Sequence, residues 1–249
     1  MTTRTTTAIA LIAVLAGPLA APVAAQTAAP VLPEFDPANF SNPKPNPYIS
    51  LEVGSRQVMA GSGMDEGKPI TEVATQIVTG PGLKLMGVQT MQILDEAVKD
   101  GRLVERTFDY YANDNEGNMW YFGEDVTNYR YDANGVFTGT DSKSAWRSGV
   151  NGAVPGISIA ANPVVGLSLY QEQAAADGAM DYFEVVAIDA TVTGPGGTFD
   201  AVLKTFEGST SDPDLREYKY YAKGVGFVRT EEELSEALDN PKMVTEVQP

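Results

Sequence analysis

The chain is predicted to be mainly β: a single antiparallel meander in a strongly curved sheet or partly open barrel. β-branched and aromatic residues fill segments of strand length from Tyr48 onward, and no long segment shows a clear helical period. Sharp turn signals separate these segments at Asp100-Gly101, Glu116-Gly117, Asn134-Gly135, Pro195-Gly196 and Lys223-Gly224. This spacing indicates successive hairpins, and the long glycine-rich loop from Ser144 to Pro163 is expected to cover the sheet.

Residues 1–25 have the layout of a signal peptide. Arg4 precedes an apolar run from Ala8 to Leu15, and small residues permit cleavage after Ala25. Prolines interrupt the segment before it reaches the ~20 residues that a membrane-spanning helix needs. The chain has no cysteine for lipid attachment. We therefore expect a periplasmic or secreted protein with no membrane span in its mature part.

The rest of the chain divides into two parts. Residues 26–47 form a proline- and alanine-rich extended lead-in, and residues 48–249 form a single β domain. Within this domain, Thr230 to Leu238 is the one plausible helix, with an irregular or strand-like segment as the alternative.

Two hairpins have turns that suggest a pairing register. A tight loop centred on Asn115-Glu116 predicts three cross-strand pairs: Tyr111 with Trp120, Tyr110 with Tyr121, and Arg106 with Asp125. A loop centred on Pro195-Gly196 predicts a core face in which Val192 meets Phe199, Ala190 meets Ala201 and Ile188 meets Leu203.

The composition excludes several classes of function. The chain contains no histidine and no cysteine, which removes Ser-His-Asp triads, cysteine nucleophiles and imidazole or thiolate metal sites. Its formal net charge of -16 repels phosphate backbones, so nucleic acid is not an expected partner.

Aromatic residues provide the first candidate site. Rings on both faces of a strand suggest either a ligand groove or a sheet covered on both sides by its own chain. The candidate ligand-binding residues are Trp146, Arg147, Tyr111, Trp120 and Tyr121. Trp146 is expected at the mouth of a groove, where Trp146→Ala would change stability little, whereas Trp120→Ala would be severely destabilising. The alternative is that Trp146 plugs the open end of the sheet.

Acidic residues provide the second and third candidates. Asp109, Asp114, Glu116 and Glu124 lie in or near one hairpin and offer the hard oxygen ligands that Ca²⁺ takes, although no register fits the EF-hand motif. A polar hairpin with solvated acids is the alternative. A carboxylate-based hydrolase acting on glycans would draw on acids in apolar strands, namely Glu105, Asp109, Glu172 and Glu207. Such acids are more often paired with an arginine or lysine on a strand.

Several stretches resemble a widespread, uncharacterised family of secreted bacterial proteins. They are DYYANDNEGNMWYFGED at Asp109 to Asp125, EYKYYAKGVGFV at Glu217 to Val228, NPYISLEVG at Asn46 to Gly54, SAWRSGVNGAVPGI at Ser144 to Ile157 and LYQE at Leu169 to Glu172. The resemblance implies export but no particular activity. The strand pattern is also loosely similar to the curved sheets of periplasmic lipid and lipoprotein carriers.

Taken together, these features predict an exported, non-catalytic binding or carrier protein for an apolar or amphipathic small molecule. Ca²⁺ binding and glycan hydrolysis are the alternatives. No cofactor other than Ca²⁺ is indicated, and the oligomeric state is left open.

Overall fold

The computed structural model describes residues 29–65 and 67–249, so the predicted signal peptide lies outside the described residues. A 3₁₀ helix, η1, spans Pro37–Phe40. The strands are β1 (Arg56–Asp65), β2 (Lys68–Leu85), β3 (Val88–Lys99), β4 (Arg102–Asn113), β5 (Met119–Tyr131), β6 (Phe137–Asp141), β7 (Trp146–Arg147), β8 (Val154–Ile159), β9 (Ser168–Tyr170), β10 (Glu172–Gln173), β11 (Asp181–Gly194), β12 (Gly197–Ser209), β13 (Arg216–Ala222), β14 (Gly226–Glu232) and β15 (Met243–Val247).

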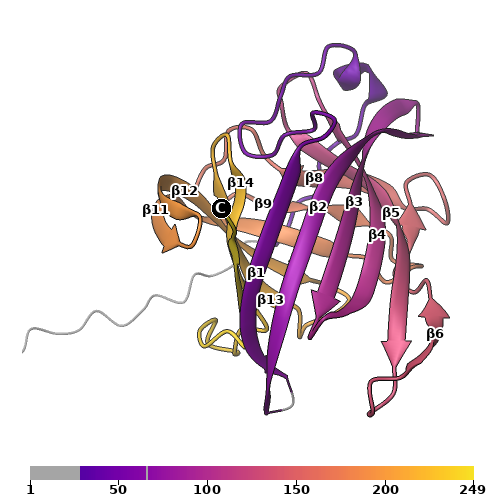
Figure 1. The fold of residues 1–249 in the computed structure, drawn as a ribbon. Coiled ribbons are helices and arrows are strands. Elements are labelled where there is room, and N and C mark those ends of the chain that lie inside the picture. Colours follow the sequence, from indigo (N-terminus) through magenta and orange to yellow (C-terminus); the bar gives the residue numbers. More distant parts are fainter. Residues whose placement is uncertain (1–28, 66) are drawn as a thin grey trace, which may run out of the picture.

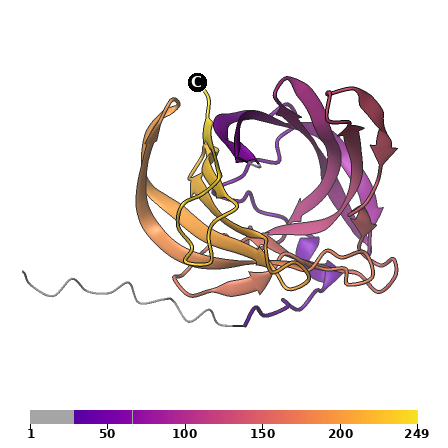
Figure 2. The same ribbon diagram turned by 90° about the horizontal axis from the view of Figure 1, so that it is seen from below.

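The strands form one antiparallel sheet that curls into a nearly closed barrel (Figures 1 and 2). Its order is β10-β8-β5-β4-β3-β2-β1-β15-β14-β13-β12-β11-β9, with β6 and β7 attached to β5. Pairing of β1 with β15 joins the two halves of the meander. The end strands β9 and β10 are the two sides of an unsealed seam. The predicted fold class is therefore confirmed.

The predicted turns connect paired strands. Asp100-Gly101 joins β3 to β4, and both residues have positive φ, at 47° and 76°. The turn near Glu116 joins β4 to β5, where Gly117 has φ 90°. Glycine tolerates this left-handed conformation without a steric penalty, which explains why these dipeptides mark the chain reversals.

The predicted helix at Thr230 to Leu238 is wrong. β14 continues to Glu232 and pairs with β15, and the chain then turns irregularly. Glu233 and Leu238 have φ values of 50° and 58°, which interrupt any right-handed helix. The irregular alternative is the one observed. Pairing with β15 gives hydrogen-bond partners to the backbone N–H and C=O groups of β14, which a short helix would have to pair within itself.

The register predicted for the first hairpin is also wrong. Tyr111 lies opposite Tyr121, and Trp120 lies opposite Ala112, so the loop shifts the pairing by one residue. A bulge after Tyr110 shifts it again. As a result, the partners predicted to form an ion pair separate: Arg106 pairs with Glu96, and Asp125 pairs with Arg147.

The second hairpin confirms part of its predicted register. Val192 lies opposite Phe199 as expected, but irregularities in the pairing of β11 with β12 place Ala190 opposite Val202 and displace Ile188 from Leu203. Ile188 is 44% exposed, so the predicted core face does not extend along the whole hairpin.

The segment from Ser144 to Pro163 is partly built into the sheet. It contains β7 and β8, and both pair with β5. Gly123 of β5 lies so close to the carbonyl of Trp146 that a Cβ at position 123 would collide with it. Trp146 therefore stands in a short strand rather than in an open loop, because a glycine opposite permits that strand to dock.

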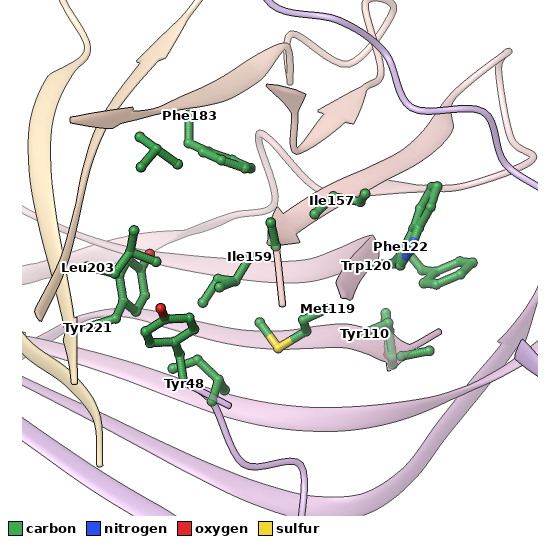
Figure 3. Close-up of a cluster of buried hydrophobic side chains, with 14 of the residues drawn as sticks. Tyr48, Tyr110, Met119, Trp120, Phe122, Ile157, Ile159, Phe183, Leu203 and Tyr221 are labelled. Carbon is green, nitrogen blue, oxygen red and sulfur yellow. The ribbon is translucent and has the colours of Figure 1, made fainter. Parts of the chain in front are cut away.

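The lead-in packs against the outer face of the barrel. Phe35 and Phe40 make edge-on contacts with Trp120 and Phe122, with ring centroids 5.6–5.9 Å apart. Trp120 and Phe122 belong to the largest buried apolar cluster, shown in Figure 3. The outward rings of β5 are thus covered by the protein's own chain. Within the described ranges, no helix is long and apolar enough to cross a membrane.

Candidate functional site

The barrel interior contains a cavity of about 410 Å³. Side chains from β3, β4, β5, β7, β10, β11 and β13 line it, because alternate residues of each strand point inward. The lining is dominated by carboxyl and aromatic groups, and one lysine, Lys219, lies among them. This size falls in the range of small-molecule sites.

Three of the predicted ligand-binding residues form one aromatic wall of this cavity. Tyr111 and Tyr121 are stacked, with ring centroids 4.6 Å apart and an interplanar angle of 17°. Trp146 meets Tyr121 edge-on at 5.3 Å. The three residues come from β4, β5 and β7, and they meet because β4 and β7 both pair with β5.

Trp146 carries an unsatisfied polar atom. Its side chain is buried, with 3% of its surface exposed, and its indole Nε1 has no hydrogen-bond partner among the described residues. An unpaired buried donor costs about 1–3 kcal/mol. A ligand acceptor that reached Nε1 would remove this cost.

The other two predicted ligand-binding residues lie elsewhere. Trp120 faces the lead-in, and its Nε1 donates to Asp114 at 2.9 Å. Arg147 makes hydrogen bonds to Asp125 on the outside of the barrel. Alternation along each strand explains the split, because Trp120 adjoins Tyr121 in β5 and Arg147 adjoins Trp146 in β7, and neighbouring side chains point to opposite faces.

Carboxyl groups line the rest of the cavity. Asp95, Glu105, Asp109, Glu124, Glu172 and Asp181 all contribute. Burial raises the pKa of Asp95 to about 6, despite a hydrogen bond from Gln76 that lowers it. Burial likewise raises the pKa of Glu172 well above its usual range, and neighbouring Asp181 raises it further. The interior therefore retains protons near neutral pH.

Asp109 and Glu124 lie directly opposite each other on β4 and β5. Tyr121 Oη donates to Asp109 Oδ1 at 2.7 Å. Burial, followed by the charge of Asp95, raises the pKa of Asp109 to about 8. Burial and then Asp109 raise the pKa of Glu124 well above its usual range. Burial and the repulsion between the two carboxylates therefore favour keeping a proton on this pair over double ionisation.

Lys219 is the cation of the interior. Its Nζ lies 2.8 Å from Glu207 and 3.0 Å from Glu217. Tyr221 Oη donates to Glu207 at 3.0 Å, which completes a buried network on β12 and β13. Burial raises the pKa of Glu217 to about 7, and Lys219 opposes that rise. The sequence predicted Glu207 as a candidate acid, but Lys219 was not predicted. The pattern that could have indicated Lys219 is the alternation of a lysine with aromatic residues in β13.

The four candidate metal ligands do not converge. Asp109 and Glu124 face the cavity, whereas Asp114 and Glu116 lie in the hairpin loop. Asp114 is already occupied by the backbone N–H groups of Glu116 and Asn118 and by two side-chain donors. Among the described residues, no group of three or more acidic side chains is arranged to hold a metal ion. The loop is a polar hairpin, but Asp114 is buried and hydrogen-bonded within the protein rather than solvated.

Comparison with known proteins shows likeness in structure only. No family model and no curated protein match the chain. A proposed lipoprotein from Parabacteroides distasonis is 15% identical, with a TM-score of 0.41, covering 82% of this chain and 98% of its own. A proposed exported protein with a YmcC-like fold from Bacteroides fragilis is 14% identical, with a TM-score of 0.37, covering 83% and 97%.

Proposed function

We propose that the protein is an exported binding protein that holds a small, hydroxyl-rich, sugar-like molecule inside the barrel. The observation that carries the proposal is the aromatic wall of Tyr111, Tyr121 and Trp146 on a cavity rich in carboxyls, with an unpaired indole N–H in that wall. Export rests on the signal-peptide pattern of residues 1–25.

The lining chemistry favours this ligand class over a purely apolar one. A wholly apolar molecule would leave the buried carboxyls and the indole N–H unsatisfied, which is unfavourable. A sugar has hydroxyls that donate to carboxylates and accept from the indole, and a C–H face that packs on an aromatic ring. Such a molecule is amphipathic, in agreement with the broader expectation from the sequence.

The test uses the two tryptophans as separate reporters. Trp120→Phe leaves Trp146 as the only indole, and Trp146→Phe leaves Trp120. Neutral mono-, di- and trisaccharides, including glucose, galactose and maltose, are titrated against both variants and the parent while fluorescence and heat are measured. We expect a saccharide to change the emission of Trp146 and not that of Trp120.

The affinity comparison makes the test specific. Trp146→Phe keeps a ring and removes the N–H, so we expect binding to weaken about tenfold, equivalent to about 1.4 kcal/mol. Trp120→Phe is the matched control and should bind as the parent does, because its N–H serves Asp114. Absence of saccharide binding at millimolar concentration, or equal affinities for the two variants, would refute the proposal.

Hydrolysis of a glycosidic bond is a second candidate because of the Asp109 and Glu124 pair. Two carboxyls that share a proton provide one acid and one base, as glycosidases require. Asp109→Asn would then abolish release of reducing sugar while leaving saccharide binding measurable. Binding without turnover by the parent protein would leave the carrier function alone.

A further inference from the structure

A second, larger cavity of about 800 Å³ lies outside the barrel interior. The lead-in and the stretch that follows it, residues 37–52, form one side. The β2–β3 turn, the end of β4 and the β13–β14 turn form the other. Figure 1 shows these segments gathered at the upper end of the strands.

Hydrogen bonds hold the lead-in wall in place. Asn46 accepts from the backbone N–H groups of Tyr48 and Ile49 and donates to the carbonyls of Gly117 and Ile159. The N–H of Gly224 donates to the carbonyl of Pro47 at 2.9 Å. The cavity is therefore bounded by fixed backbone on both sides.

The floor of this cavity is apolar. Tyr48 and Val88 are each 4% exposed and belong to the main core cluster. Leu51 and Met91 extend this surface, and Val225 contributes a 47% exposed side chain at the edge. Contact with these groups would remove apolar ligand surface from water.

The rim carries positive charge in an otherwise acidic protein. Lys44 and Lys84 line the cavity, and Lys223 Nζ lies 5.8 Å from the centre of the Tyr48 ring. None of the three makes a salt bridge with a residue that the structure describes. Glu52 is the single acid in the lining. This contrasts with the 33 acidic and 17 basic residues of the whole chain.

We propose that this cavity binds a single-chain amphipathic anion, such as a long-chain carboxylate. Its hydrocarbon chain lies on the apolar floor between the lead-in and the β2–β3 turn, and its head group lies among Lys44, Lys84 and Lys223. The complementary charges orient the molecule, and the apolar floor supplies most of the affinity. This site shares Ile49 with the lining of the interior cavity but is otherwise lined by different residues, and it does not depend on the function proposed for the interior.

The primary test titrates the full protein with dodecanoate and, separately, with dodecyltrimethylammonium, below their micelle-forming concentrations. The two probes have the same chain length and opposite charge. We expect the carboxylate to bind at least tenfold more tightly, and added salt to reduce the difference because it screens exposed charges. Equal affinities would overturn the proposal, since the lysine rim would then have no role.

Variants locate the site. Replacing Lys44, Lys84 and Lys223 together with glutamine should weaken dodecanoate binding about tenfold. The matched control replaces Lys68, Lys143 and Lys242, which removes the same charge away from the cavity lining and should leave affinity near that of the parent. Equal loss in both triple variants would attribute the effect to net charge and overturn the assignment.

The apolar floor has its own control. Val225→Ser should weaken binding, whereas Val136→Ser, at a similarly exposed valine outside the cavity, should not. Vesicles of phosphatidylglycerol distinguish a free amphiphile from a membrane surface. Binding to vesicles without binding to monomeric dodecanoate would overturn the proposal in favour of a membrane-facing patch.

Discussion

At the scale of single residues, the two tryptophans are buried equally but perform different tasks. Trp120 packs under Phe40 and donates to Asp114, whereas Trp146 forms part of the interior wall with an unpaired N–H. The same 3% exposure at both positions means that loss of either ring opens a space in a packed region.

We therefore expect Trp146→Ala and Trp120→Ala each to lower the free energy of unfolding by about 3 kcal/mol or more. This revises the expectation from sequence that Trp146→Ala would be nearly neutral, because that expectation placed the ring in an open loop. Trp146→Phe should cost much less, since it keeps most of the packing and removes the unpaired donor. Urea unfolding of the three variants measures the differences.

Lys219 is the residue whose loss should be most harmful electrostatically. Lys219→Met would leave Glu207 and Glu217 buried without their cation, which costs about 3–5 kcal/mol at neutral pH. Adding Glu207→Gln should restore part of the stability because it removes one uncompensated charge. Thermal unfolding of the single and double variants tests this, and no recovery in the double variant would mean that Lys219 acts through packing.

At the scale of elements, the β4–β5 hairpin is held by its loop. The Asp114 side chain accepts from the N–H groups of Glu116 and Asn118, from the Asn118 side chain and from the Trp120 indole. Asp114→Ala should therefore destabilise the protein by about 2 kcal/mol or more, since the indole is buried. Ca²⁺ should not restore this loss. Glu116→Ala, a neighbouring loop acid without these contacts, is the control in denaturant titration.

The hairpins show what could be predicted and what could not. Turn dipeptides such as Asp100-Gly101 have a local physical cause, positive φ, and the sequence reveals them. The bulge after Tyr110 has no comparable signature, yet it leaves Phe122 of β5 without a partner and shifts the rest of that strand, so that Tyr121 and Glu124 both line the cavity. For this reason the strands were predictable while the pairing of Arg106 with Asp125 was wrong.

The candidate site likewise contains some residues that the sequence predicted and others that it could not. Tyr111, Tyr121 and Trp146 were predictable as a group of aromatic candidates, and the structure brings them together. The sequence did not show that Arg147 and Trp146 point in opposite directions. The structure places both in a two-residue strand, where adjacent side chains point to opposite faces. The lysine-rimmed cavity depends on contacts between residues 37–52 and distant turns, which no local pattern specifies.

At the scale of the whole molecule, buried carboxyls should make stability depend on pH. The pKa values of Asp95, Glu217 and Asp109 are raised to about 6, 7 and 8, above those of the unfolded chain near 4. The folded state therefore holds protons that the unfolded state releases between these limits. Stability is fully present at the acidic end and decreases as pH rises from about 4 to about 8.

The measurement is the unfolding midpoint at pH 5 and pH 8.5 in buffers of equal ionic strength. We expect the midpoint to be higher at pH 5. Asp109→Asn should reduce the difference, because it removes a group whose folded pKa of about 8 lies far above its unfolded value. An exposed control, Asp132→Asn, should leave the difference unchanged. A midpoint that rises with pH in the parent would contradict the interior protonation described above.

The pairing of β1 with β15 has a consequence for how the chain reaches this fold. Met59 to Gly63 meet Met243 to Val247, so this contact spans nearly the whole domain in sequence, whereas the other meander pairings join close neighbours. Bringing such distant segments together carries the largest loop-closure entropy, so early hairpins form before it. A chain delivered through a membrane with its N-terminus first would hold an unjoined β1 edge until β15 emerged. Joining the two halves of the sheet through β1 and β15 is then the last step, and the period before it is when a chaperone would be needed.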